Sequence, residues 1–193
     1  MSGITISFMQ KDEHQESASV LSIAMLKNPL HIAIFQGESE SERIQIEQMF
    51  VGLLSDLPEI VYVAKDRGEI IGVMRMKSCQ GRKGLKAPEG PQDLEKLPWR
   101  EYLWLKEWGQ HEPSNQHWHL GPIGVLPAYQ GQGIGTQLMG RFCQEVDACQ
   151  ASAYLETDLD RNVVFYEKFE FRIVSTSLIF DVNNRYMLRD SRP

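Results

Sequence analysis

The segment from His117 to Met139 constrains the fold of this chain more than any other part of the sequence. It reads HWHLGPIGVLPAYQGQGIGTQLM. An apolar run at 120–126 is typical of a strand, a turn follows it, and glycines at 131, 133 and 135 precede an amphipathic helix. The first turn of a helix carries unpaired N–H groups and the positive end of the helix dipole. This order of elements therefore predicts a cradle for an anion such as a phosphate.

Two common phosphate-binding loops do not fit this cradle. A Walker loop needs Gly-Lys followed by Ser or Thr, and the chain has no such triplet. A dinucleotide fingerprint that starts at Gly131 needs glycine or alanine at position 136, where this chain has Thr136. The pattern that remains is Gln130-x-x-Gly133-x-Gly135. A tight turn before a packed helix is the alternative interpretation.

This hexapeptide resembles the Q/R-x-x-G-x-G/A signature of the GCN5-related N-acetyltransferases (GNAT), which hold the pyrophosphate of acetyl-CoA there. The stretch from Tyr154 to Phe171, YLETDLDRNVVFYEKFEF, is similar to the next strand and helix of that family. Its Leu-Glu-Thr triplet resembles small-molecule, puromycin-type members. Together the motifs cover about residues 117–171. Glu170 departs from the family's usual glycine and puts the tight exit of the preceding helix in doubt.

Periodicity alone predicts an α+β or α/β domain with a mixed sheet. The resemblance implies a single GNAT domain over residues 1–193, with a mixed, mostly antiparallel sheet of about seven strands and about four helices. The predicted strands are 4–9, 59–65, 69–76, 117–126, 152–157, 171–181 and 184–189. The predicted helices are 12–27, ended by Asn28-Pro29, then 39–55, 134–149 and 161–168. Between them lie a mobile loop at 78–92 and an aromatic, partly helical stretch at 93–108, in which Pro98 bends or starts an element.

Composition limits the class of protein. The 193 residues are 42% hydrophobic, as in a globular domain, and no apolar run approaches the ~20 residues that span a bilayer. The N-terminal stretch lacks the basic start and apolar segment of a signal peptide, so we expect a cytoplasmic protein and no membrane partner. A net charge of −6 argues against nucleic acid and favours a cationic amine. Three cysteines without a C-x-x-C pair indicate reduced thiols, none of them catalytic.

The resemblance implies acetyl-CoA as co-substrate, with no metal. Its pyrophosphate would be held by backbone N–H groups of Gln130, Gly131, Gln132, Gly133, Ile134, Gly135 and Thr136. The strand before the turn would lie alongside the pantetheine arm through the main chain of Ile123 and Val125, which are also candidate core residues. Pro122 suits a bulge in that strand, as the family has. Asn162 would bind the same arm, or else only start the short helix.

Tyr166 is the acid toward the leaving sulfur that the resemblance implies, and a buried core tyrosine is the alternative. A phenol of pKa ~10 gives its proton to a thiolate of pKa ~8.5 only at a cost of ~2 kcal/mol. Two residues are candidates for the general base: Glu156, which is slightly favoured, and His119. The alternative for Glu156 is a buried, hydrogen-bonded carboxylate without a catalytic role. The alternative for His119 is a position on a polar face of the sheet. A metal site at His117 and His119 is disfavoured, because no further ligands cluster with them.

Acceptor recognition is expected from the loop at 28–38, the insertion at 78–114 and the turn at 180–184. The aromatic residues of the insertion either line a pocket for an apolar or cationic amine, or cover the sheet or a homodimer contact, which is favoured; they are Trp99, Tyr102, Trp104 and Trp108. The sequence thus predicts an acetyl-CoA-dependent N-acetyltransferase that acts on a small primary amine in a ternary complex. The alternatives are a non-catalytic acyl-CoA-binding domain and a peptide or protein N-acetyltransferase.

Overall fold

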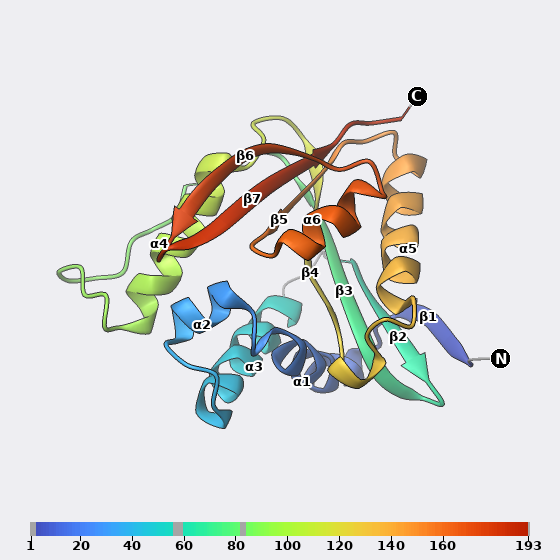
Figure 1. Cartoon of the computed structure of the whole chain (residues 1–193), viewed down its shortest axis with the longest axis horizontal. Helices are drawn as coiled ribbons and strands as arrows, with labels where there is room; N and C mark the ends of the chain where they lie inside the picture. The colour runs from blue at the N-terminus through green and yellow to red at the C-terminus, as the bar shows by residue number, and fades with distance from the viewer. Residues whose placement is uncertain (1–2, 56–59, 82–83, 193) are drawn as a thin grey trace.

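The computed structural model describes residues 3–55, 60–81 and 84–192. Within these ranges the chain forms a seven-stranded sheet with helices on both faces (Figure 1). The strands are β1 (Ile4–Phe8), β2 (Ile60–Asp66), β3 (Glu69–Cys79), β4 (His117–Val125), β5 (Ala153–Thr157), β6 (Arg172–Ile179) and β7 (Val182–Arg189). Their order in the sheet is β1-β2-β3-β4-β5-β7-β6, and all neighbours are antiparallel except β4 and β5. The predicted mixed, mostly antiparallel sheet is confirmed.

The described residues form six α-helices, two more than the firm predictions from the sequence. They are α1 (His14–Met25), α2 (Pro29–Phe35), α3 (Glu40–Ser55), α4 (Leu97–His111), α5 (Ile134–Ala148) and α6 (Asp160–Glu167). The prediction of a loop at 28–38 is wrong for the residues that form α2. Asn28 accepts a hydrogen bond from the His31 N–H, and Pro29 occupies the first helical position, where no N–H is needed. The dipeptide that ends α1 therefore also begins α2.

Helix α4 begins within the stretch at 93–108 and runs on to His111. Pro98 lies in its first turn, so this proline starts an element and does not bend one. Glu59, the first residue of the second predicted strand, lies outside the described residues, as do residues 82–83 of the predicted loop.

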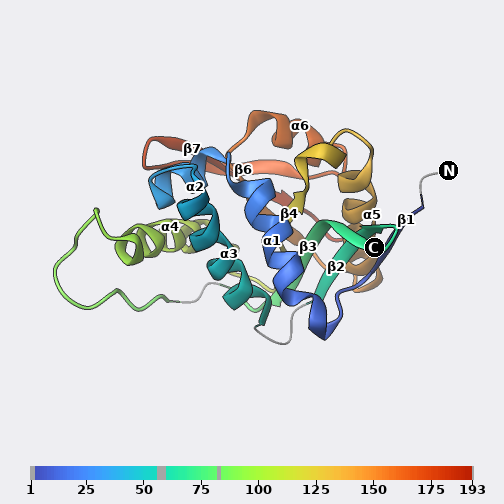
Figure 2. The same ribbon diagram turned by 90° about the horizontal axis from the view of Figure 1, so that it is seen from below.

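Successive side chains of β2 face opposite sides of the sheet, so they belong alternately to two separate cores. Tyr62 and Ala64 pack in the cluster that α5 completes, whereas Val61 and Val63 pack in the cluster formed with α1, α2 and α3. Figure 2 shows β2 and β3 lying between α5 on one side and α1 and α3 on the other. The sheet is therefore covered on both faces where the functional site begins.

The predicted bulge lies in β4, opposite a single residue of β3. The register passes from Met76↔Leu120 to Met74↔Ile123, so Gly121 and Pro122 together face Arg75. Pro122 is tolerated there, inside the sheet, because its missing N–H falls at the irregularity. The buried Arg75 donates from Nη1 to the Gly121 carbonyl oxygen at 2.7 Å, which fixes the bulged backbone.

Helix α1 lies directly against β4 at Gly124. A Cβ atom added at this glycine would lie 3.0 Å from Cβ of Ala24 and 3.1 Å from Cδ2 of Leu21. Such contacts are too tight for an ordinary side chain. The absence of a side chain at position 124 therefore sets the spacing between helix and strand.

The exit of α6 stays tight although Glu170 replaces the expected glycine. Glu170 has a φ of 68° in the left-handed region, and the N–H of Phe171 donates to the Tyr166 carbonyl oxygen at 3.3 Å. The Glu170 carboxylate forms an ion pair with Arg192 at 2.6 Å. The departure from the family pattern thus changes the residue and keeps the turn.

No single helix in the described part of the chain has the length and apolarity needed to cross a membrane. By length and composition alone, one pair of helices joined by a 103° bend, Lys11–Met25 and Pro29–Phe35, passes the same test.

Candidate active site

The parallel pairing of β4 with β5 ends early and opens the sheet. In the part of the chain that the structure describes, the two strands pair at Trp118↔Ala153 and His119↔Tyr154. Two cavities lie around this opening: a groove of about 1000 Å³ beside the turn before α5, and a cavity of about 510 Å³ under α2, α3 and α4. Both are lined by Ile123, Asn162 and Tyr166, so the cavities meet at these residues.

The groove has the features of an anion cradle. Gly131 and Gly133 have φ angles of 77° and 82°, a conformation that suits glycine. A Cβ added at either would meet nothing within 4 Å, so the space over the turn is open. Gly133 caps α5, whose first intrahelical bond runs from the Gln137 N–H to the Gly133 carbonyl oxygen. The N–H groups of residues 134–136 therefore have no partner within the helix and are available to a phosphate.

His119 and Glu156, the two candidate bases, lie together. His119 is on β4 and Glu156 is on β5, two residues beyond the partner of His119. His119 Nε2 lies 2.7 Å from Glu156 Oε2, and the carboxylate side chain is 6% exposed. An imidazole nitrogen and a carboxylate oxygen at this distance share one hydrogen. The sequence presented the two residues as alternatives, and the structure brings them together as a pair.

Tyr166 lies at the junction of the two cavities. It is buried, and its ring packs against Phe165 and Phe171 in the core. Burial, together with the charges of Asp158 and Glu156, raises the pKa of the Tyr166 phenol above its usual range. The hydroxyl is therefore protonated at neutral pH. Core packing, one of the two alternatives for Tyr166, is observed, and the role as acid toward the leaving sulfur stays a prediction.

The smaller cavity is mostly apolar. Its apolar lining comes from α1 to α4 and the β4 bulge: Met25, Leu30, Met49, Phe50, Leu53, Trp104, Leu105, Trp108 and Pro122. Burial lowers the pKa of His31 to about 4 and raises the pKa of Glu101. Both polar residues line this cavity. The site thus combines an apolar chamber, a hydrogen-bonded base candidate and a phenol beside an anion cradle.

Comparison with known proteins assigns the family. The family model described as the acetyltransferase (GNAT) family matches residues 22–171 of this chain. The chain belongs to this family. It is an N-acetyltransferase with acetyl-CoA as its co-substrate. The open glycine turn and the unpaired N–H groups of α5 fit the pyrophosphate of that co-substrate.

Solved structures share the GNAT fold at low sequence identity. One is a histone acetyltransferase and related acetyltransferase from Corynebacterium glutamicum, with 16% identity, a TM-score of 0.71 and coverage of 100% of this chain and 98% of that chain. Another is a mosquito arylalkylamine N-acetyltransferase-like protein, with 15% identity, a TM-score of 0.64 and coverage of 97% and 99%. A GNAT acetyltransferase from Brucella melitensis in complex with acetyl-CoA has 17% identity, a TM-score of 0.57 and coverage of 100% and 91%. At these identities the likeness concerns the fold.

Nine of the ten predicted cofactor residues line the groove of this GNAT enzyme. They are Ile123, Val125, Gln130, Gly131, Gly133, Ile134, Gly135, Thr136 and Asn162. Gln132 does not line it, because its side-chain amide donates to the Ala128 carbonyl oxygen at 3.2 Å. The Gln130 amide likewise donates to the Val125 carbonyl oxygen at 3.0 Å. Both glutamine side chains therefore hold the turn.

The acceptor side of this GNAT enzyme differs in part from the sequence expectation. Trp104 and Trp108 line the smaller cavity, whereas Trp99 and Tyr102 pack edge to face on each other outside its lining. Residues 180–184 are absent from that lining, and α3, which was not expected there, contributes four residues: Met49, Phe50, Gly52 and Leu53.

Sequence reasoning also missed Asp158. Its carboxylate accepts hydrogen bonds from the Asn28 side-chain amide at 2.7 Å and from the Leu30 N–H at 2.9 Å. This contact ties the end of β5 to α2 and places α2 over the cavity. The sequence presented Asn28-Pro29 only as the end of a helix, and nothing in it pairs two segments so far apart.

Proposed function

We propose that this GNAT enzyme transfers the acetyl group to a primary amine of a small molecule bound in the 510 Å³ cavity. The observation that carries the proposal is the His119–Glu156 pair, 2.7 Å apart in the wall of an apolar cavity. That cavity meets the groove at Tyr166 and Asn162. Its volume falls in the range of small-molecule pockets.

The lining of the cavity indicates the class of amine. Trp104 and Trp108 offer aromatic faces, and Glu101, Glu156 and Asp158 supply carboxylates beside the apolar helices. Aromatic faces and carboxylates both favour a cation, and the apolar wall favours a hydrocarbon or aromatic body. The proposed acceptor is therefore an amine attached to an apolar or aromatic group, which the net charge of −6 helps to attract.

The donor is proposed to be held mainly by backbone. The N–H groups at 134–136 bind its pyrophosphate, the main chain of Ile123 and Val125 runs beside the pantetheine arm, and Asn162 hydrogen-bonds that arm. Acetyl-CoA supplies an acetyl group already activated as a thioester. The residues of this chain orient the two substrates and assist two proton movements. One proton leaves the ammonium before the amine attacks, and a second leaves the nitrogen as the C–S bond breaks and ends on the thiolate.

The proton of the amine is proposed to pass to the His119–Glu156 pair. An alkyl amine of pKa ~10.4 loses its proton at pH 7 only at a cost of ~4–5 kcal/mol, which falls to about 1 kcal/mol for a pKa of ~7.7. Glu156 accepts the proton, and His119 holds and stabilises its carboxylate. Tyr166 donates a hydrogen bond to the leaving sulfur. Because the site raises the pKa of this phenol, it stabilises the developing thiolate without first giving up its proton.

The test compares Glu156→Gln with wild type on an alkyl amine and on a weakly basic amine of similar shape. We expect kcat/KM to fall by ~10²–10⁴ for the alkyl amine, the usual contribution of a general base. The loss should be much smaller for the weakly basic amine, because its proton costs little to remove. Glu101→Gln, a second carboxylate of the same cavity, is the matched control: it should raise KM for the cationic alkyl amine and leave kcat unchanged on both amines.

Equal losses on both amines would assign Glu156 to binding and not to proton removal. Wild-type enzyme that acetylates none of a panel of small amines, while still binding acetyl-CoA, would contradict the proposed acceptor class.

A further inference from the structure

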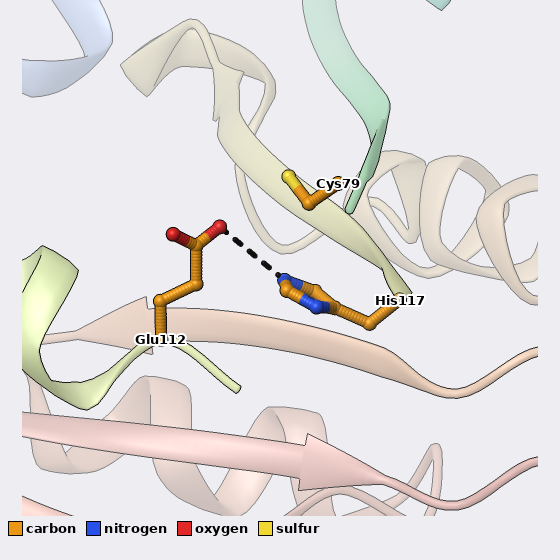
Figure 3. Close-up of side chains that lie close together, drawn as sticks. All are labelled: Cys79, Glu112 and His117. Atoms are coloured by element: carbon orange, nitrogen blue, oxygen red, sulfur yellow. Dashed lines mark ion pairs between the residues drawn. The ribbon is translucent and has the colours of Figure 1, made fainter. Parts of the chain in front are cut away.

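A second group of ligating side chains lies outside the acetyl-transfer site. Cys79 ends β3, His117 begins β4, and Glu112 follows the last turn of α4 (Figure 3). One donor atom from each residue lies within 4.8 Å of the other two. In the described ranges this is the one group of three such residues that meets this geometry. Its donors are a sulfur, an imidazole nitrogen and a carboxylate oxygen.

The backbone around this group is tightly built. Cys79 and His117 face each other across the antiparallel β3–β4 pair, so their side chains share one face of the sheet. Gly81, just after β3, touches the loop before β4: an added Cβ there would lie 2.3 Å from the carbonyl oxygen of Ser114. The two loops next to the cluster are thus pressed together. Cys79 and His117 are 7% and 1% exposed.

The contacts of His117 determine which of its nitrogens faces the cluster. Nδ1 lies 2.8 Å from the carbonyl oxygen of Asn115, which can only accept, so Nδ1 carries a hydrogen and donates it. Nε2 lies 3.5 Å from Glu112 Oε1, too far for a good hydrogen bond, and makes none to the described residues. A histidine that donates one ring N–H to a carbonyl oxygen and turns its other nitrogen toward a thiol and a carboxylate is oriented as a metal ligand, and the thiol and that nitrogen release their protons when the ion binds.

We propose that Cys79, Glu112 and His117 bind a divalent cation of the zinc class. Thiolate and imidazole ligands select such borderline-soft ions over magnesium or calcium, which prefer oxygen. Bonds of ~2.0–2.3 Å in a tetrahedral site place ligand atoms about 3.5 Å apart, so the side chains need to close by ~1 Å. The fourth position is open to water. No step of acetyl transfer passes through this ion.

The site was not apparent in the sequence, which offered only His117 with His119. The structure uses Nε2 of His119 in the contact with Glu156, so His119 is not a ligand of the proposed site. The other two ligands come from β3 and from the end of α4. The β3–β4 register places Cys79 opposite His117, and Glu112 reaches them from the loop between α4 and β4.

The experiment uses the full chain, stripped of metal with a chelator and titrated with Zn²⁺ in competition with a chromophoric chelator. Co²⁺ is added to a parallel sample as a spectroscopic probe. We expect about one ion per chain and a thiolate-to-cobalt charge-transfer band. Cys79→Ser should lose the band and weaken affinity by more than the roughly 10–100-fold that loss of an outer partner costs. Cys149→Ser, the matched control at the exposed cysteine, should keep both.

Glu112→Gln is the second variant. Glu112 is only half-buried, and its replacement by glutamine hardly changes the volume of the side chain. This variant should bind Zn²⁺ more weakly than wild type, and a circular-dichroism spectrum of the metal-free variant that matches metal-free wild type checks that the variant folds. Wild-type protein that leaves the chelator fully loaded with Zn²⁺ would overturn the proposal. So would Cys79→Ser and Glu112→Gln variants that bind Zn²⁺ as tightly as wild type.

Discussion

Tyr166 shows how one buried side chain serves both stability and chemistry. Its ring packs against Phe165 and Phe171, which holds the phenol at the junction of groove and cavity. The same burial raises the pKa of its hydroxyl, so the group stays a hydrogen-bond donor over the whole physiological range. The hydroxyl of Tyr166 makes no hydrogen bond to the described residues, so the packing of the ring positions this side chain.

Replacing Tyr166 by phenylalanine tests this role with little change in packing. We expect kcat to fall by ~10² or more, because a positioned hydrogen-bond donor to developing negative charge contributes about that much. The Kd of acetyl-CoA and the melting temperature should stay close to those of wild type. Steady-state kinetics, calorimetry of acetyl-CoA binding and thermal denaturation check the three quantities. A kcat equal to that of wild type would remove Tyr166 from the mechanism.

His31 links the stability of the protein to pH. Burial lowers the pKa of His31 to about 4 in the folded state, from 6.5 in the unfolded chain. Between these two values the unfolded chain binds a proton that the folded protein does not. The free energy of unfolding should therefore decrease as pH falls from 6.5 to 4, by about 3 kcal/mol, and stop changing on this account below pH 4.

Urea denaturation of wild type and His31→Gln at several pH values between 7 and 4 isolates this contribution. Other groups titrate equally in both proteins, so the difference between the two curves belongs to His31. Curves that stay parallel across this range would contradict the prediction.

At the scale of elements, the strand–turn–helix unit of β4 and α5 supplies most of the residues proposed to bind acetyl-CoA. The bulge at Gly121 and Pro122 redirects β4, the glycine turn opens the cradle, and the start of α5 supplies its N–H groups. Gly124 adds a further constraint, because α1 packs directly on it. The position of α1 over this unit therefore depends on the lack of a side chain at one residue.

Gly124→Ala should destabilise the protein by about 1–3 kcal/mol, the usual cost of overpacking. Gly140→Ala in α5 is the matched control: an added Cβ there meets nothing within 4 Å, and alanine should stabilise the helix by roughly 0.5–1 kcal/mol. Chemical denaturation of the two variants measures both changes. Equal stabilities would show that α1 moves away from β4 at no cost.

The elements that could be predicted from the sequence are those with strong local signals. The apolar run, the glycine spacing and the apolar stripe of 134–149 predicted β4, the turn and α5 nearly to the residue. Helix α2 could not be predicted, because Asn28-Pro29 ends one helix and starts another, and the first effect is the better-known signal. The His119–Glu156 contact and the Asp158–Leu30 contact depend on sheet register and long-range packing, which no local pattern encodes.

At the scale of the whole molecule, the groove joins parts of the chain that are far apart. It is lined by α1, by β4 with the turn and α5, and by α6. A ligand in this groove binds only the folded protein and should raise its stability by mass action, by about 2.7 kcal/mol at 100 times its Kd.

Thr136 allows a test of this coupling without backbone strain. Thr136→Glu places a negative charge beside the expected pyrophosphate, and two like charges about 4 Å apart repel by a few kcal/mol near a protein surface, enough to weaken acetyl-CoA binding roughly 10-fold or more. The same charge suits the first turn of α5, so the ligand-free protein should not be destabilised. Thr136→Gln is the neutral control. Melting curves with and without acetyl-CoA should show the ligand-induced shift reduced only in Thr136→Glu.

The short parallel contact between β4 and β5 makes the molecule modular. Within the described residues these strands meet at two residue pairs. The sheet therefore consists of two sectors, β1–β4 and β5-β7-β6, which are joined by this short pairing. The donor cradle belongs to the first sector, and the acceptor chamber is roofed by α2, α3 and α4. Substitutions in the roof helices can reshape the chamber while the ladders within each sector, and the cradle, stay intact. Acceptor choice is thus the property of this enzyme most open to change by mutation, and donor choice the least.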